Sequence, residues 1–190
     1  MMTVIKMIQQ LFEHMEWADA LVWRSVLLNP VVASDTTVRE RLLHIHVVQH
    51  GFLHLWRQQS LPELPTPLDF PNTKRIATWG REYHEDVATY LDGLEETLLD
   101  SPLGIPWADQ LADRLGRQPS PVSLVQTMLQ VTSHSSHHRG QVNVRIRELG
   151  CEAPLVDFIS WIWLGQPSAD WDSIAEAASN VTMEPTRAGS

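Results

Sequence analysis

The sequence contains a single cysteine, Cys151, among its 190 residues, and this scarcity excludes two classes of protein. One cysteine cannot form an intrachain disulfide framework, and it cannot supply a cage of thiolate ligands for a metal ion. The low count also fits a reducing compartment. The position of Cys151, just beyond a predicted helix, favours a packed or edge thiol over a catalytic nucleophile.

The sequence also lacks an excess of basic residues and a long apolar run. Its formal net charge is −9, whereas capture of nucleic acid requires a basic surface. The most apolar stretch, residues 155–165, is interrupted by Asp157 and is too short to span a bilayer. The N-terminus lacks the unbroken apolar core of a signal peptide. We therefore expect a soluble, cytoplasmic protein that acts on a small molecule, with no nucleic-acid and no membrane partner.

Apolar residues recur at helical rather than alternating spacing, and prolines separate the segments that carry them. The pattern predicts four long helices, over 4–28, about 35–59, about 74–100 and about 121–149. Thr37 and Glu40 are a candidate capping box at the start of the second helix. Four prolines predict a loop over 61–72, and further prolines and glycines predict an irregular crossover with a short helix over 102–121.

After the fourth helix, the sequence predicts a short helix over 155–164 that packs its tryptophans on the others. Four long helices with one long crossover form a bundle, so the fold class is all-α, a four-helix bundle with a short C-terminal helix. We predict one bundle domain over residues 1–166. Residues 167–190 are predicted to be a polar tail, with at most one loose helix near 171–179.

The segment TSHSSHHRGQV, residues 132–142, places three histidines within five positions of the fourth predicted helix. His134 and His138 are four residues apart and lie within roughly 40° of each other on the apolar side of that helix. His137 lies toward the edge of this side. Two imidazoles at this spacing can chelate one ion, so His134 and His138 are half of a candidate metal site.

The second helix carries four histidines from which a third ligand can come. His46, His50 and His54 gather with Arg57 on what we interpret as a polar, flanking face, with a surface metal site as the weaker alternative. His44 lies opposite, on the apolar stripe that we expect to face the core. We therefore predict that His44, His134 and His138 hold the metal.

A competing interpretation is that these histidines are hydrogen-bonded core residues, as buried polar side chains usually are. His14 and His84 have no partner in the sequence pattern and receive that interpretation. Arg145, two turns beyond His138, is a candidate contact for an anionic substrate group, with an ordinary ion pair as the alternative. Asp157, Gln141 and Asp19 are candidates to hold the second nitrogen of a ligand.

Three segments, HSSHHRGQV, LLHIHVVQHGFLHLW and HMEWADALVW, together resemble the DinB/YfiT-like family, over roughly residues 4–165. The resemblance implies a four-helix bundle in up-down-down-up order. It also implies a divalent metal ion, nickel or zinc, held by the residues here numbered His44, His134 and His138. The chain departs from the family pattern at Gln49, where an acidic residue is common, and at His14 and Ser133, which replace asparagines.

Members of that family include transferases that use low-molecular-weight thiols and suspected hydrolases. We therefore expect a metal-dependent enzyme, either a thiol-dependent S-transferase or a hydrolase. Two alternatives stay open: a non-catalytic metal- or ligand-binding helical bundle, and a dimeric scaffold whose core histidines hold no metal. The tryptophan-rich segments favour a helix-packed homodimer.

Overall fold

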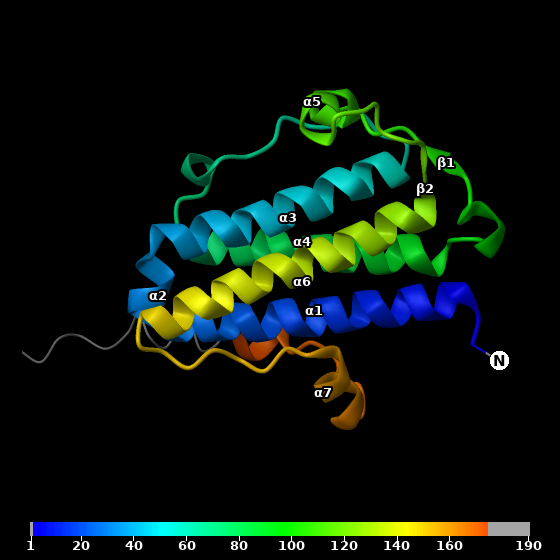
Figure 1. Cartoon of the computed structure of the whole chain (residues 1–190). Coiled ribbons are helices and arrows are strands. Elements are labelled where there is room, and N and C mark those ends of the chain that lie inside the picture. Colours follow the sequence, from blue (N-terminus) through cyan, green and yellow to red (C-terminus); the bar gives the residue numbers. More distant parts are fainter. Residues whose placement is uncertain (1, 175–190) are drawn as a thin grey trace, which may run out of the picture.

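The computed structural model describes residues 2–174, and helices make up most of this part of the chain. Four long helices run side by side (Figure 1): α1 Val4–Leu28, α3 Thr36–Trp56, α4 Thr73–Asp92 and α6 Leu124–Glu148. The shorter helices are α2 Pro30–Ser34, α5 Ala112–Leu115 and α7 Phe158–Trp163, with 3-10 turns at Pro67–Asp69, Glu96–Leu98 and Ala108–Leu111. Two short strands, β1 Pro102–Leu103 and β2 Val122–Ser123, pair antiparallel. The all-α prediction is confirmed.

Each long helix packs against two others. The contacts join α3 with α6, α6 with α1, α1 with α4, and α4 with α3. Asp35, at the start of α3, forms an ion pair of 2.7 Å with Arg145, near the end of α6, so these two helices are antiparallel. The seam between α3 and α6 therefore brings the beginning of one helix beside the end of the other.

The ends of several helices differ from the sequence-based expectation. The predicted capping box of Thr37 and Glu40 is wrong, because the Asp35 side chain already accepts the Val38 N–H at 2.9 Å and starts α3. Pro30 begins the unexpected helix α2, since proline is well tolerated at a first helical position. Helix α4 ends at Asp92, where Gly93 is its C-cap, several residues before the expected end.

Two apolar clusters fill the bundle, one on each side of a layer of polar side chains. One cluster surrounds Trp23 and Ile45, and the other surrounds Phe12 and Tyr83. Each long helix passes through both clusters. We call the buried side chains between them the polar layer; its members are Asp19, His46, Gln49, His84, Ser135 and Arg139.

The C-terminal part of the described chain lies against the bundle. In α7, Trp161 is buried and its indole N–H donates to the Pro167 carbonyl at 3.0 Å, whereas Trp163 is 78% exposed. The expected packing of the tryptophans is thus found for one of the two. Trp171 is also buried and donates to Glu16.

Residues 171–174 are helical, and the rest of the expected helix over 171–179 lies outside the described residues. The domain boundary at residue 166 stays a prediction. Within residues 2–174, no helix combines the length and the apolar character needed to cross a membrane.

Candidate metal centre

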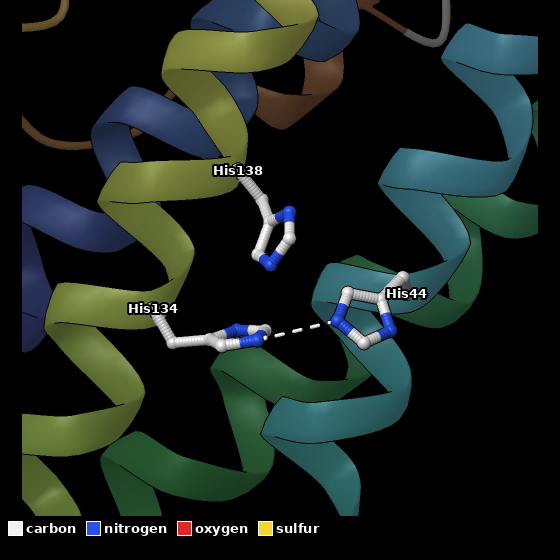
Figure 2. A group of neighbouring side chains, drawn as sticks. All are labelled: His44, His134 and His138. Atoms are coloured by element: carbon white, nitrogen blue, oxygen red, sulfur yellow. Dashed lines mark hydrogen bonds between the residues drawn. The ribbon is translucent and has the colours of Figure 1, made fainter. Parts of the chain in front are cut away.

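Three histidines converge at the seam between α3 and α6. His44 projects from α3 toward His134 and His138, which lie one turn apart on α6 (Figure 2). One ring nitrogen of each lies within 4.8 Å of those of the other two, and the Nε2 atoms of His44 and His134 are 3.2 Å apart. The structure thus brings together the three residues singled out from the sequence. We call them the histidine cluster.

The spacing and charge state of the histidine cluster fit a divalent metal ion. A tetrahedral zinc ion with bonds of about 2.0–2.1 Å separates its ligand nitrogens by about 3.3 Å, close to the observed Nε2–Nε2 distance. Burial, together with the charges of the neighbouring histidines, lowers the pKa of His134 to about 4. Partial desolvation of the His44 ring at the seam, together with the nearby His138, also lowers the pKa of His44. Both rings are therefore neutral at pH 7 and each keeps a lone pair for a metal.

The hydrogen bonds around the cluster decide which nitrogen of His138 is free. His138 donates from Nδ1 to the side-chain oxygen of Gln141 at 3.0 Å, which leaves Nε2 with its lone pair. The amide group of Gln141 in turn donates to Nε2 of His137 at 2.9 Å, so that nitrogen is occupied. Of the three candidates for this supporting role, Gln141 is the one that contacts a cluster histidine. The Nδ1 atom of His134 is buried without a hydrogen-bond partner among residues 2–174.

The reason for choosing His44 from the sequence was wrong, although His44 does join the cluster. His44 is exposed, and His46 is the histidine that is fully buried in the bundle. Ile45 and Phe52 do face the bundle interior, but His44 lies on a side of α3 at the edge of the bundle. Part of this side is covered instead by Leu61, Leu64 and Trp107, which come from the loop and the crossover.

The predicted apolar stripe of α6 is buried at Leu124, Met128, Val131, Val142 and Ile146, but the two histidines do not lie at its centre. Ser135 and Arg139 are buried and face the polar layer, whereas His134 and His138 are half-buried at the edge of the stripe. Helix α6 packs against both α1 and α3, so its buried surface is wide. A helical wheel shows which residues share that surface, but it does not show which of them lie at its centre and which at its edge.

A cavity of about 390 Å3 adjoins the histidine cluster. Its walls are mostly apolar; they are His44, Val47, Val48, Gly51, Phe52, Leu61, Leu64, Trp107, Gln130 and His134. No carboxylate among the described residues lines it. Sequence reasoning missed this cavity because Leu61, Leu64 and Trp107 come from irregular segments, whose paths no periodicity reveals.

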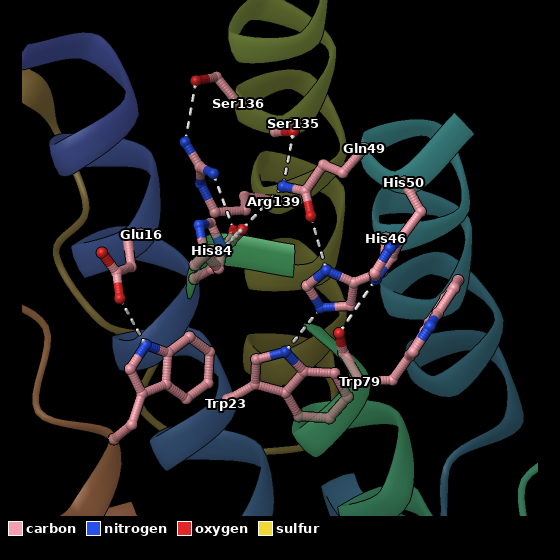
Figure 3. Close-up of polar contacts among 12 residues, drawn as sticks. Glu16, Trp23, His46, Gln49, His50, Trp79, His84, Ser135, Ser136 and Arg139 are labelled. Atoms are coloured by element: carbon pink, nitrogen blue, oxygen red, sulfur yellow. Dashed lines mark hydrogen bonds and ion pairs between the residues drawn. The ribbon is translucent and has the colours of Figure 1, made fainter. Parts of the chain in front are cut away.

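The polar layer contains a second group of histidines, but these contact protein partners (Figure 3). Asp19 accepts hydrogen bonds from Arg139 at 2.8 Å, from His84 at 3.0 Å and from Gln49 at 2.9 Å. Although burial opposes ionisation, Arg139 and His84 hold the pKa of Asp19 well below its usual range. Asp19 is therefore a buried carboxylate whose charge is balanced by a buried arginine.

Both nitrogens of His46 are engaged in hydrogen bonds. Trp23 donates its indole N–H to Nε2 of His46 at 2.9 Å, and Nδ1 of His46 donates to Gln49 at 2.7 Å. Burial lowers the pKa of His46 to about 4, so the ring is neutral with one fixed tautomer. Gly80 leaves the space for this ring, because a Cβ atom at that position would collide with it.

The interpretation of His46, His50 and His54 as a polar, flanking face is wrong for His46, whereas His50 and His54 are half-buried. His46 is fully buried, while His50 stacks on Trp79 with ring centroids 4.1 Å apart and donates to the Trp79 carbonyl. Burial lowers the pKa of His50 to about 4. Within residues 2–174, the histidine cluster is the one group of three whose spacing suits a metal.

The remaining candidates have ordinary structural contacts. His14 donates to the Val156 carbonyl at 2.9 Å, and His84 donates to Asp19, as expected for hydrogen-bonded core histidines. Arg145 forms ion pairs with Asp35 at 2.7 Å and with Glu148 at 3.1 Å. These contacts match the alternative interpretation of Arg145, and its role as a substrate contact stays a prediction.

Comparison with known proteins agrees with the resemblance seen in the sequence. The model of the DinB family matches residues 2–169, which is most of the chain. The protein therefore belongs to the DinB family. No curated protein matches the sequence.

Proposed function

We propose that the protein binds a divalent metal ion, zinc or nickel, through His44, His134 and His138, and that it is a metal-dependent enzyme acting on a small molecule. The reaction is that of a thiol-dependent S-transferase or of a hydrolase. The observation that carries the proposal is the convergence of three imidazole nitrogens within 4.8 Å of one another at one helix seam. Membership of the DinB family supports it.

Two features favour a catalytic over a structural metal. Structural zinc sites have four protein ligands, whereas catalytic sites have three and leave a position open. The histidine cluster offers three, and His44 is exposed to solvent. The adjoining cavity of about 390 Å3 is large enough for a small organic molecule.

The residues around the cluster have distinct tasks in this proposal. A divalent ion held by neutral imidazoles lowers the pKa of a bound water or thiol and polarises a carbonyl group. Gln141 fixes the tautomer of His138 through Nδ1 and so keeps its Nε2 available. Phe52 and Trp107, which meet edge to face with ring centroids 5.5 Å apart, bind the apolar part of the substrate and exclude water.

The proposal includes the arrangement and the partners expected from the sequence. We take the long helices to form the up-down-down-up bundle, which is supported by the antiparallel contact of α3 with α6. A small-molecule substrate, with no nucleic-acid or membrane partner, is supported by the net charge of −9. A homodimer is supported by exposed apolar side chains in and beside α7, among them Ile159 and Trp163. The cytoplasmic location stays a prediction.

Metal analysis of the purified protein without a histidine tag tests the proposal. We expect about one zinc or nickel ion per chain, because three imidazole ligands suffice for a catalytic site. His44→Ala and His138→Ala should each lose the metal. His137→Ala is the matched control, because its ring is next to His138 but its Nε2 is occupied by Gln141. Equal metal content in the parent and in both ligand variants would show that the cluster does not bind the metal.

Turnover assays separate the enzyme from a binding protein. The metal-loaded protein is incubated with small electrophiles and a panel of low-molecular-weight thiols, and separately with simple esters and amides. A rate that disappears in His138→Ala supports the enzyme, and the productive set identifies the reaction. Metal binding without any metal-dependent rate would favour a non-catalytic bundle, and absence of metal would favour a scaffold with core histidines.

A further inference from the structure

A second cavity, of about 410 Å3, lies at the same seam as the histidine cluster. It is lined by Thr37, Arg41, Gln141, Val144, Arg145 and Glu148. Arg41 precedes His44 by three residues on α3, and Gln141 follows His138 by three residues on α6. Because α3 and α6 are antiparallel, this polar cavity and the apolar cavity beside Phe52 lie on opposite sides of the histidine cluster.

The two arginines of the polar cavity differ in their partners. Arg145 is paired with two carboxylates, those of Asp35 and Glu148, so its charge is balanced. Arg41 donates to the main-chain oxygen of Gln141 at 2.9 Å and has no carboxylate partner among residues 2–174. Its guanidinium group has five N–H donors, and one such bond leaves the others available to an anion.

Arg41 is also close to the proposed metal ligands. Three residues correspond to about 4.5 Å along a helix axis, and residues at this spacing share one face. Gln141 contacts both residues: its main-chain oxygen accepts a hydrogen bond from Arg41, and its side-chain oxygen accepts one from His138. A group bound by Arg41 therefore lies within one helical turn of the histidine cluster.

We propose that Arg41 is the anion-binding residue of this seam, and that the substrate is a small molecule with a carboxylate at one end and an apolar group at the other. The carboxylate binds Arg41, the apolar group enters the cavity beside Phe52 and Trp107, and the reacting bond lies between them at the histidine cluster. The distance from Arg41 to Val48, on the wall of the apolar cavity, is about 10 Å along the axis of α3. This inference rests on the proposed function for the reacting position, but the carboxylate contact itself requires no metal.

A pair of compounds that differ in one charge tests the assignment. 6-Phenylhexanoate and its neutral amide, 6-phenylhexanamide, carry a phenyl ring at the end opposite the polar group. Titration calorimetry measures their affinities for the zinc-treated and the zinc-free protein. We expect the carboxylate to bind about tenfold more tightly than the amide, because hydrogen bonds to charged groups are the stronger ones. In Arg41→Gln this preference should disappear while zinc binding stays unchanged, and Tm should fall by no more than about 2–4 °C, because the variant loses the bond to the Gln141 main-chain oxygen.

Two further variants distinguish the role of Arg41 from a general effect of charge. Arg41→Lys keeps the charge and should keep part of the preference. Arg147→Gln removes the same charge from α6 but on the wall of a different cavity, beside His14, and should keep all of it. A carboxylate preference that survives Arg41→Gln, or binding of neither compound to the parent, would overturn the inference. If the preference depends on Arg41 but no zinc binds, the proposed metal function fails and this inference stands.

Discussion

The histidine cluster and the polar layer both place histidines between helices, but the nitrogen atoms of the two groups are used differently. In the polar layer, His46 donates from one nitrogen and accepts at the other, so no lone pair is left. In the histidine cluster, the Nε2 atoms of His44 and His134 face each other at 3.2 Å. What distinguishes the cluster is that ring nitrogens of three histidines converge within 4.8 Å, whereas His46 and His84 of the polar layer are each bonded to a protein partner.

The two groups also differ in what they contribute to stability. The polar layer holds a buried ion pair, Arg139 with Asp19, in which both side chains are no more than 3% exposed. The side chains of the histidine cluster are exposed or half-buried, and none of them forms a buried ion pair with another described residue. Changes in the polar layer should therefore alter folding, whereas changes in the cluster should alter metal binding and leave the fold intact.

The largest effect is expected from Asp19→Asn, which removes the buried negative charge but keeps the shape. Arg139 is then left as an uncompensated buried charge, and we expect the free energy of unfolding at pH 7 to fall by about 3–5 kcal/mol. Urea unfolding measures it. Asp86→Asn is the control, because its ion pair with Arg57 is exposed and should contribute no more than about 1 kcal/mol. Equal losses in the two variants would remove the contrast between buried and exposed charge.

A smaller effect is expected from acid. The folded-state pKa of His46 is about 4, below its value in the unfolded chain, so the unfolded state binds more protons between pH 6.5 and 4. The stabilising contribution of neutral His46 is present above pH 6.5 and lost as the pH falls through this window, by on the order of 3 kcal/mol.

Urea unfolding of the metal-free protein at successive pH values measures this loss together with that of His50, whose pKa is also lowered to about 4. The variant His44→Ala with His134→Ala is the control, because it removes two histidines of the cluster with lowered pKa values and keeps His46. We expect the variant to retain a loss of stability across the window. A flat profile in the variant would place the pH dependence in the histidine cluster instead of the polar layer.

The smallest effect is expected from Gln141→Ala, which removes a supporting contact and leaves all three candidate ligands in place. Without the hydrogen bond to Nδ1, His138 loses its fixed tautomer and orientation, and zinc affinity should fall about 10- to 100-fold. Competition with a chromophoric chelator measures the affinity. Gln49→Ala serves as the comparison in the polar layer, where the expected loss is in stability and not in zinc affinity.

Much of the fold was predictable because it depends on local chemistry. Helix α1 spans Val4–Leu28, as its apolar periodicity predicts, and Gly150 follows the end of α6 with a positive φ of 79°. The shared face of His134 and His138 was also predictable, because four-residue spacing places two side chains on one face of any helix. The first residue of α3 was harder to predict, because the side chains of Asp35 and Thr37 can both cap a helix. In the folded chain Asp35 is the cap, and its carboxylate accepts the Val38 N–H.

The sequence by itself determined that the chain is helical and that His134 and His138 share a face, because both follow from hydrogen bonding and geometry within one helix. Only the tertiary structure decided that His44 is exposed and His46 buried, since both lie on one helix with apolar neighbours on several sides. His46 lies on the side of α3 that the other long helices cover, whereas His44 lies on the side that Trp107 and the loop partly cover. That choice depends on contacts between residues far apart in the chain, which no local pattern records.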